Sequence, residues 1–289
     1  MVSLLLCPTI QCFAWWPGGC LAAYCQAAQA KATGYLPIKM KLFYFTSGPR
    51  ERAFDAVFAA GHEIVAVYAT DPTRWPKVTT TLHRARERGI PIRIVGKRDL
   101  EAISEEVRGQ ICLSVGFGYI FPKSFLQSVA VCINVHGTLL PKYAGRTLNW
   151  IIECGEQESG VTVHLVDEGI DTGPILLQRS FPLSPFETGR SLARKTQEFE
   201  PALVVEALEI YGRHGAAAAR PQQLDGVTRL PDRIPEHSHL DPRRPLIELY
   251  DQIRAADPDH YPAYFEIAGE RVCVRLWRPD KPADEADLI

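Results

Sequence analysis

A regular alternation of apolar and amphipathic segments between residues 41 and 118 constrains the fold more than any other feature of the chain. Short runs rich in β-branched and aromatic residues are separated by segments with helical spacing, each of which ends at a glycine. The expected strands are residues 41–47, 63–69, 90–96 and 110–118, and the expected helices are residues 50–61, 80–89 and 100–109. This alternation predicts an α/β fold: a Rossmann-like, mostly parallel sheet with helices on both faces. In such sheets ligands bind beyond the carboxyl ends of the strands.

The pattern continues to about residue 211 and then changes. Further strands are expected at 130–137, 160–167 and 174–183, and further helices at 147–156 and 188–211. After Gly212 the chain is rich in proline, alanine and charge, and it ends in a short amphipathic helix and a hairpin that turns at residues 268–270. We therefore expect three parts: an N-terminal extension (1–39), a catalytic domain (40–212) and a small C-terminal α+β subdomain with linker and tail (213–289).

Residues 1–39 are rich in apolar side chains, but Pro8 and Pro17 interrupt the apolar stretch. The segment also lacks the basic n-region of a secretory signal, which disfavours a cleaved signal. Met40 directly precedes the first clean strand. A mis-set translation start at Met1 is therefore the favoured interpretation, and a disordered or packing extension is the alternative. The cysteines of this segment lack the CxxC spacing of zinc sites, and the remaining cysteines are scattered. Scattered thiols suit a reducing compartment and predict a cytoplasmic protein.

Overall charge and hydropathy exclude some partners. The net charge is −2 at pH 7, which gives no indication of general adhesion to nucleic acid or to an anionic membrane. No apolar run reaches the roughly 20 residues that a membrane-spanning helix needs. The familiar signatures GxGxxG, GxxxxGK[ST], GxSxG and HExxH are absent from the sequence. The histidines in the segment 236–239 lie in a polar linker and are interpreted as solvated, so no metal site is predicted.

Three polar residues remain at the ends of expected strands. Asn134 and His136 alternate at the end of one strand, so their side chains share one face. Asp171 lies in a glycine-flanked loop between two later strands, whereas His164 lies inside its strand and is interpreted as a core histidine. A carboxylate can orient or charge an imidazole, and an imidazole and an amide can both donate to a developing oxyanion. This combination, without a Ser or Cys nucleophile, predicts transfer of an activated acyl group to an amine.

The same residues carry a resemblance to a known family. "NVHGTLLPKYAGR" followed by "GVTVHLVDEGIDTGPIL" resembles the N10-formyltetrahydrofolate-dependent formyltransferases, most of all those that act on sugar nucleotides. The shared pattern is Asn134, His136, the segment 138–141 and Asp171, over a similarity that spans residues 40 to about 211. The segment "YAGRTLNW" departs from the family pattern, with Ala144 in place of an arginine.

The resemblance implies a formyl donor and specific roles. Asn134, His136 and Asp171 are expected to be catalytic, N10-formyltetrahydrofolate is the expected donor, and no metal is implied. The residues expected to bind the donor are Gly116, Phe117, Gly118, Tyr119, Ile120, Asp167, Glu168, Gly169 and Ile170. The residues expected to bind the acceptor are Lys142, Tyr143, Arg146 and Trp150.

The acceptor is expected to be a small molecule, an amino-deoxysugar nucleotide. From Arg213 to Ile289, 11 Lys and Arg stand against 14 Asp and Glu, which disfavours a nucleic-acid partner. The alternatives are methionyl-tRNA, an amino acid such as hydroxyornithine, or water in a formyltetrahydrofolate deformylase. A binding protein without activity is a further alternative, and the oligomeric state, with a homodimer among the options, stays open.

Overall fold

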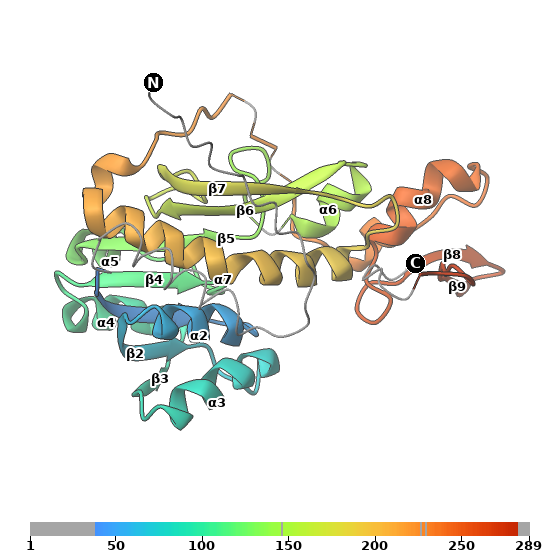
Figure 1. The fold of residues 1–289 in the computed structure, drawn as a ribbon. Helices are drawn as coiled ribbons and strands as arrows, with labels where there is room; N and C mark the ends of the chain where they lie inside the picture. The colour runs from blue at the N-terminus through green and yellow to red at the C-terminus, as the bar shows by residue number, and fades with distance from the viewer. Residues whose placement is uncertain (1–37, 146, 226, 229, 283–289) are drawn as a thin grey trace, which may run out of the picture. The chain divides into compact units, whose positions relative to one another are not determined.

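The computed structural model describes residues 38–145, 147–225, 227–228 and 230–282. The seven strands of the main sheet are β1 (Lys41–Thr46), β2 (Glu63–Ala69), β3 (Ile92–Ile94), β4 (Ile111–Val115), β5 (Val131–His136), β6 (Glu158–Leu165) and β7 (Ile175–Pro182). Their order is β3-β2-β1-β4-β5-β6-β7 (Figure 1). Strands β1 to β5 are parallel, whereas β6 and β7 are antiparallel to their neighbours. The predicted mostly parallel sheet is therefore confirmed.

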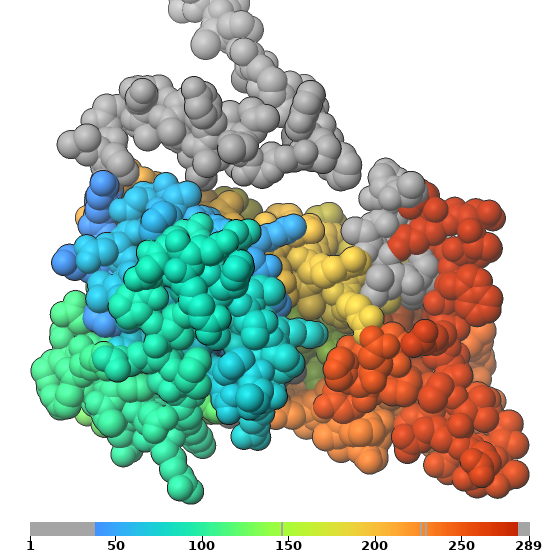
Figure 2. Space-filling model, turned by 90° about the horizontal axis from the view of Figure 1, so that it is seen from below, coloured from blue at the N-terminus to red at the C-terminus, as the bar shows by residue number. Residues whose placement is uncertain are grey.

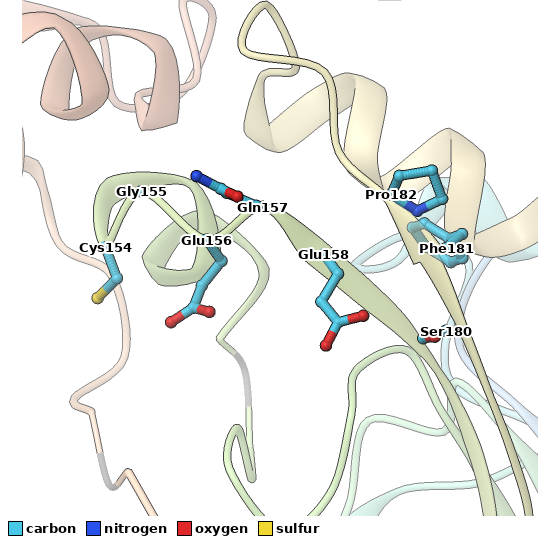
Figure 3. A pocket seen from close by; sticks show the side chains of 8 residues that line it. All are labelled: Cys154, Gly155, Glu156, Gln157, Glu158, Ser180, Phe181 and Pro182. Carbon is cyan, nitrogen blue, oxygen red and sulfur yellow. The ribbon is translucent and has the colours of Figure 1, made fainter.

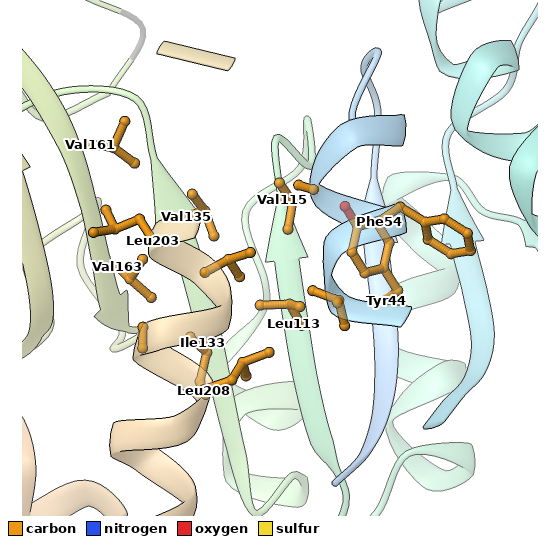
Figure 4. Packing of buried hydrophobic residues seen from close by; sticks show 14 of the residues in the cluster. Tyr44, Phe54, Leu113, Val115, Ile133, Val135, Val161, Val163, Leu203 and Leu208 are labelled. Atoms are coloured by element: carbon orange, nitrogen blue, oxygen red, sulfur yellow. The ribbon is translucent and has the colours of Figure 1, made fainter. Parts of the chain in front are cut away.

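Helices cover both faces of this sheet, as predicted. The helices between residues 51 and 214 are α2 (Glu51–Ala59), α3 (Thr79–Glu87), α4 (Leu100–Glu106), α5 (Lys123–Ser128), α6 (Leu148–Glu153) and α7 (Gly189–His214). On one face, side chains of α2 and α7 such as Phe54 and Leu203 pack against Tyr44, Leu113 and Ile133 (Figure 4). On the other face, α4 and α5 cover a second apolar cluster that contains Phe45 and Tyr68. Alternate residues of β1 therefore enter different cores, as the period of two in a strand requires.

Two strands, β3 and β4, are clearly shorter than predicted. The segment 90–96 forms only the three-residue strand β3, in which Arg93 and Ile94 are exposed at the edge of the sheet. Strand β4 ends at Val115, because Gly116 adopts a φ of +64° that a strand does not allow. The residues that follow are a loop beyond the carboxyl end of β4, where ligands of parallel sheets bind.

The C-terminal segment adds α8 (Leu246–Ala255) and a hairpin of β8 (Ala263–Ile267) and β9 (Glu270–Val274). Helix α8 contacts α6, and the guanidinium of Arg254 donates to the carbonyl oxygen of Glu187 at 2.8 Å. Figure 2 shows this segment, in orange and red, beside the yellow segment that leads into α7. Across the described ranges, no helix has the length and apolar character that a membrane span requires.

Candidate active site

The carboxyl end of β5 presents Asn134 and His136 on one face of the sheet. Ile133 and Val135 point to the core beneath α7, so the alternate residues point to the opposite face. Strand β6 runs antiparallel beside β5, and its register brings His164 opposite Asn134 and Thr162 opposite His136. The two expected side chains therefore share a face, as the spacing in the sequence predicts.

Asp171 reaches this face from the loop between β6 and β7. Its backbone has a φ of 54°, and its carboxylate Oδ2 accepts a hydrogen bond from the Gly145 N–H at 2.8 Å. The side chain of Gln222 donates to the carbonyl oxygens of Asp171 and Gly173, at 2.9 and 2.6 Å. These bonds hold the loop in one conformation, with the carboxylate turned towards β5 and β6.

Gly173 permits the tight return of this loop. A Cβ atom at Gly173 would lie 1.8 Å from the carbonyl oxygen of Leu165, so a side chain there requires the backbone to move. We expect Gly173→Ala to displace Asp171 and to lower kcat at least about tenfold, because small misplacements of catalytic groups are costly. The measurement is steady-state kinetics beside a thermal melt. Gly96→Ala, in an exposed segment, is the control, and equal activity of the two variants would contradict the expectation.

The trio expected from the sequence lies together in the structure. The His136 Nδ1 atom is 3.4 Å from Asp171 Oδ2, and the side chains are 12% and 16% exposed. The Asn134 Nδ2 atom is 3.1 Å from His164 Nε2, which is 3.5 Å from Asp171 Oδ1. Asp171 therefore faces two imidazoles, one from β5 and one from β6.

The protonation states follow from these partners. His136 Nε2 lies 2.9 Å from the carbonyl oxygen of Tyr143, so this nitrogen carries a proton and Nδ1 faces Asp171. Burial lowers the pKa of His136, and the negative charge of Asp171 only partly offsets this effect. Burial raises the pKa of Asp171, but the neighbouring His136 and the Gly145 N–H help to hold that pKa below its usual range. Asp171 is thus ionised beside an imidazole that can gain a proton at Nδ1.

His164 makes contacts with the trio that the sequence did not predict. It is buried inside β6, as expected of a core histidine, with 2% of its side chain exposed, but it also contacts Asn134 and Asp171. The contact depends on the antiparallel pairing of β5 with β6, which single-strand periodicity does not reveal. The only signal in the sequence is that the histidine precedes the Asp171 loop by a few residues.

The residues expected to bind the donor lie on two loops. Gly118 donates through its N–H to Ser47 Oγ at 2.7 Å, and a Cβ at Gly118 would meet Trp75 at 2.9 Å. The side chains of Phe117 and Tyr119 pack against the core beneath α4 and α5. Ile120 is an exposed apolar side chain of this loop, with 62% exposure.

The second loop is stabilised by its own carboxylate. Asp167 Oδ1 accepts from the Gly169 N–H at 3.1 Å and from the Thr172 hydroxyl at 2.7 Å. Glu168 pairs with Lys123 of α5 at 2.8 Å, and Ile170 is 57% exposed. Ile120 and Ile170 thus expose apolar surface on two loops that are otherwise held by their own hydrogen bonds.

The residues expected to bind the acceptor have protein partners. The Lys142 Nζ and Tyr143 hydroxyl groups each donate to Glu156 Oε1 at 2.7 Å. The Trp150 indole donates to the carbonyl oxygen of Pro231 at 2.8 Å, and the Arg233 guanidinium lies 4.7 Å from its ring centroid. Arg146 lies outside the described residues.

A hollow of about 700 Å³ lies beside Glu156 (Figure 3). Its lining residues are Cys154, Gly155, Glu156, Gln157, Glu158, Ser180, Phe181 and Pro182. Asn134, His136 and Asp171 are not part of this lining. Glu156 nevertheless connects the hollow to the loop that carries Lys142 and Tyr143.

Comparisons with known proteins identify the family of the chain. The formyl transferase family model matches residues 62–208. The chain is 35% identical over 236 residues to the methionyl-tRNA formyltransferase of Parvibaculum lavamentivorans, which covers 77% of this chain and 75% of that protein. The chain therefore belongs to the formyl transferase family and is a formyl-transferring enzyme.

Two solved structures share the fold. A sugar N-formyltransferase from Shewanella sp. superposes with a TM-score of 0.66 at 20% identity, over 82% of this chain and 97% of that chain. HypX from Aquifex aeolicus, in complex with tetrahydrofolic acid, superposes with a TM-score of 0.61 at 19% identity, over 81% of this chain and 37% of that chain. At these identities the likeness concerns the architecture, which agrees with the predicted fold class.

Proposed function

We propose that the chain transfers a formyl group from N10-formyltetrahydrofolate to a primary amine, with Asn134, His136 and Asp171 as the catalytic residues. The observation that most supports this proposal is the distance of 3.4 Å between His136 Nδ1 and Asp171 Oδ2, beside an amide on the same strand. The folate is a substrate, and the loops 116–120 and 167–170 bind it. Ile120 and Ile170 are exposed apolar side chains of these loops, and we expect them to contact the pterin ring.

In the reaction, the amine nitrogen bonds to the formyl carbon and the bond from that carbon to N10 then breaks. Asn134 donates to the formyl oxygen, on which negative charge develops. Asp171 helps to take the proton from the amine, and that proton passes to N10 overall. Protonation of His136 at Nδ1, which faces Asp171, gives an imidazolium whose positive charge stabilises the oxyanion, because charges interact strongly in a buried site.

The first candidate acceptor is the α-amine of methionyl-tRNA. The similarity to a methionyl-tRNA formyltransferase, at 35% identity over most of both chains, supports this acceptor more than the amino-sugar expected from the sequence. The charge count of residues 213–289 pointed away from tRNA, but it describes the whole segment and not the surface around the trio.

The second candidate is an amino-deoxysugar nucleotide. The observation that favours it is the C-terminal segment, which is a small helix-and-hairpin unit with about −3 net charge over residues 213–289. A segment with this net charge gives no electrostatic attraction for the phosphates of tRNA as a whole.

A panel of acceptors tests these proposals. The full chain is incubated with N10-formyltetrahydrofolate and, in turn, methionyl-tRNA, 3-amino and 4-amino deoxysugar nucleotides, and hydroxyornithine, and tetrahydrofolate release is followed. We expect formylated methionyl-tRNA, with a rate that falls steeply with salt because phosphate contacts are screened. A salt-insensitive product with an amino sugar would favour the second candidate. Release of formate without any acceptor would identify a deformylase, and no turnover with any acceptor would contradict the proposed function.

A further inference from the structure

His164 is a buried polar group that the proposed mechanism does not use. It lies inside β6, its side chain is 2% exposed, and three polar partners surround it. These are the carbonyl oxygen of Leu165, the amide of Asn134 and the carboxylate of Asp171. A buried imidazole between two residues of a proposed active site affects how those residues are oriented.

The hydrogen bonds of His164 determine its tautomer. Nδ1 lies 2.9 Å from the Leu165 carbonyl oxygen, which can only accept, so Nδ1 carries the proton. In the neutral ring Nε2 then carries a lone pair. The Asn134 Nδ2 atom lies 3.1 Å from Nε2, closer than the 3.5 Å to Asp171 Oδ1. Nε2 therefore accepts a hydrogen bond from the Asn134 amide, its nearer partner, and the longer contact with the Asp171 carboxylate is not counted as a hydrogen bond.

This bond also fixes the direction of the amide. Asn134 Nδ2 has two N–H groups, and one of them is taken by His164. The second points away from His164 and is the group that can donate to a ligand. If the amide rotated by 180°, its oxygen would meet the Nε2 lone pair, and two acceptors in a buried site repel each other.

We propose that His164 is a positioning residue that holds the Asn134 amide with an N–H, and not the oxygen, towards the formyl oxygen. This inference rests on the proposed function, in which Asn134 is the donor to the oxyanion. It explains why an imidazole occupies the interior of β6, opposite Asn134 in the strand register. Without His164 the amide can rotate, and its oxygen then opposes the developing negative charge.

Two substitutions separate positioning from packing. His164→Leu removes the acceptor, and we expect kcat to fall about 10- to 100-fold, with KM for the folate changed less than about threefold. His164→Gln puts an amide oxygen near the former Nε2 position, and we expect it to recover most of kcat. His62→Leu is the matched control, because His62 is a buried histidine that pairs with the Met40 N–H away from the site.

A double-mutant cycle with Asn134→Ala identifies the residue through which His164 acts. If His164 acts through Asn134, His164→Leu costs no further kcat in the Asn134→Ala background, so the two effects are strongly non-additive. Full additivity in this cycle, or a His164→Gln variant as slow as His164→Leu, would overturn the proposal. Non-additivity with Asp171→Asn instead would assign the effect to the carboxylate, which also overturns it.

The tautomer can be measured without any turnover. In the full chain labelled with ¹⁵N-histidine, NMR at neutral pH should show His164 protonated at Nδ1 and unprotonated at Nε2, and His62→Leu should leave these signals in place. A proton on Nε2 at neutral pH would overturn the inference even in an active enzyme. An inactive wild-type enzyme with the expected tautomer would instead count against the proposed function alone.

Discussion

Asp171→Asn should lower the rate of formyl transfer by about 10²–10⁴-fold, the range that a positioned acid–base group contributes. The substitution removes the charge that faces His136 at 3.4 Å, so the imidazole loses the partner that stabilises its protonated form. Asparagine tolerates the φ of 54° and keeps an oxygen for the Gly145 N–H, so the loop should retain its conformation. The measurement is kcat with the best acceptor of the panel.

The partner substitution and its control complete this test. His136→Ala should cost a similar factor, and the double variant Asp171→Asn with His136→Ala should be little slower than either, because the two residues act as one unit. His62→Ala removes a buried histidine outside the site and should keep most of the activity. Near-normal rates for His136→Ala or Asp171→Asn would refute the mechanism, whichever acceptor is used.

Phe45→Ala should lower the free energy of unfolding by about 3–5 kcal/mol, the usual cost of truncating a buried aromatic side chain. Phe45 is fully buried in β1 and stacks on Tyr68 with ring centroids 4.7 Å apart. Its ring also meets Phe117, Phe121 and Phe125 edge-on, at 5.4, 5.3 and 5.6 Å. Urea unfolding of the wild type and the variant measures the loss.

This cavity should also affect the proposed donor site. Phe117 belongs to the loop 116–120, so removal of the ring beneath it should loosen that loop and raise KM for the folate more than it lowers kcat. Phe58→Ala is the control, because Phe58 lies on α2 with 44% of its surface exposed. A loss of stability no larger than that of Phe58→Ala would mean that the aromatic cluster is not a main support of this face.

Asn134 and His136 could be predicted from the sequence because their relation depends only on the local spacing along one strand. Asn134 and His136 are two residues apart in a strand, and this spacing alone puts them on one face. Asp171 was found from its glycine-flanked loop and from the family resemblance. The alternation of apolar strands and helices similarly predicted the mostly parallel sheet, since strands of such sheets are covered by helices on both faces.

The orientation of β6 and β7 was beyond such reasoning. Side chains alternate with a period of two in parallel and antiparallel strands alike. The pattern of β6 therefore could not reveal that β6 runs antiparallel to β5 and brings His164 opposite Asn134. The hydrogen-bond partners of the residues expected to bind the acceptor substrate could not be predicted from the sequence either. Trp150 bonds to Pro231 and Tyr143 bonds to Glu156, and both contacts depend on how distant segments meet.

The sequence by itself thus determined the fold class and the family, and it predicted the three polar residues Asn134, His136 and Asp171, because these follow from local periodicity and from motifs shared with the family. Tertiary structure alone decided the surroundings of the trio, including the second imidazole that faces Asp171 and the loop whose Tyr143 carbonyl and Gly145 N–H contact His136 and Asp171. The physical reason is that hydrogen bonds between strands and loops depend on register and packing, which join residues that no local pattern relates.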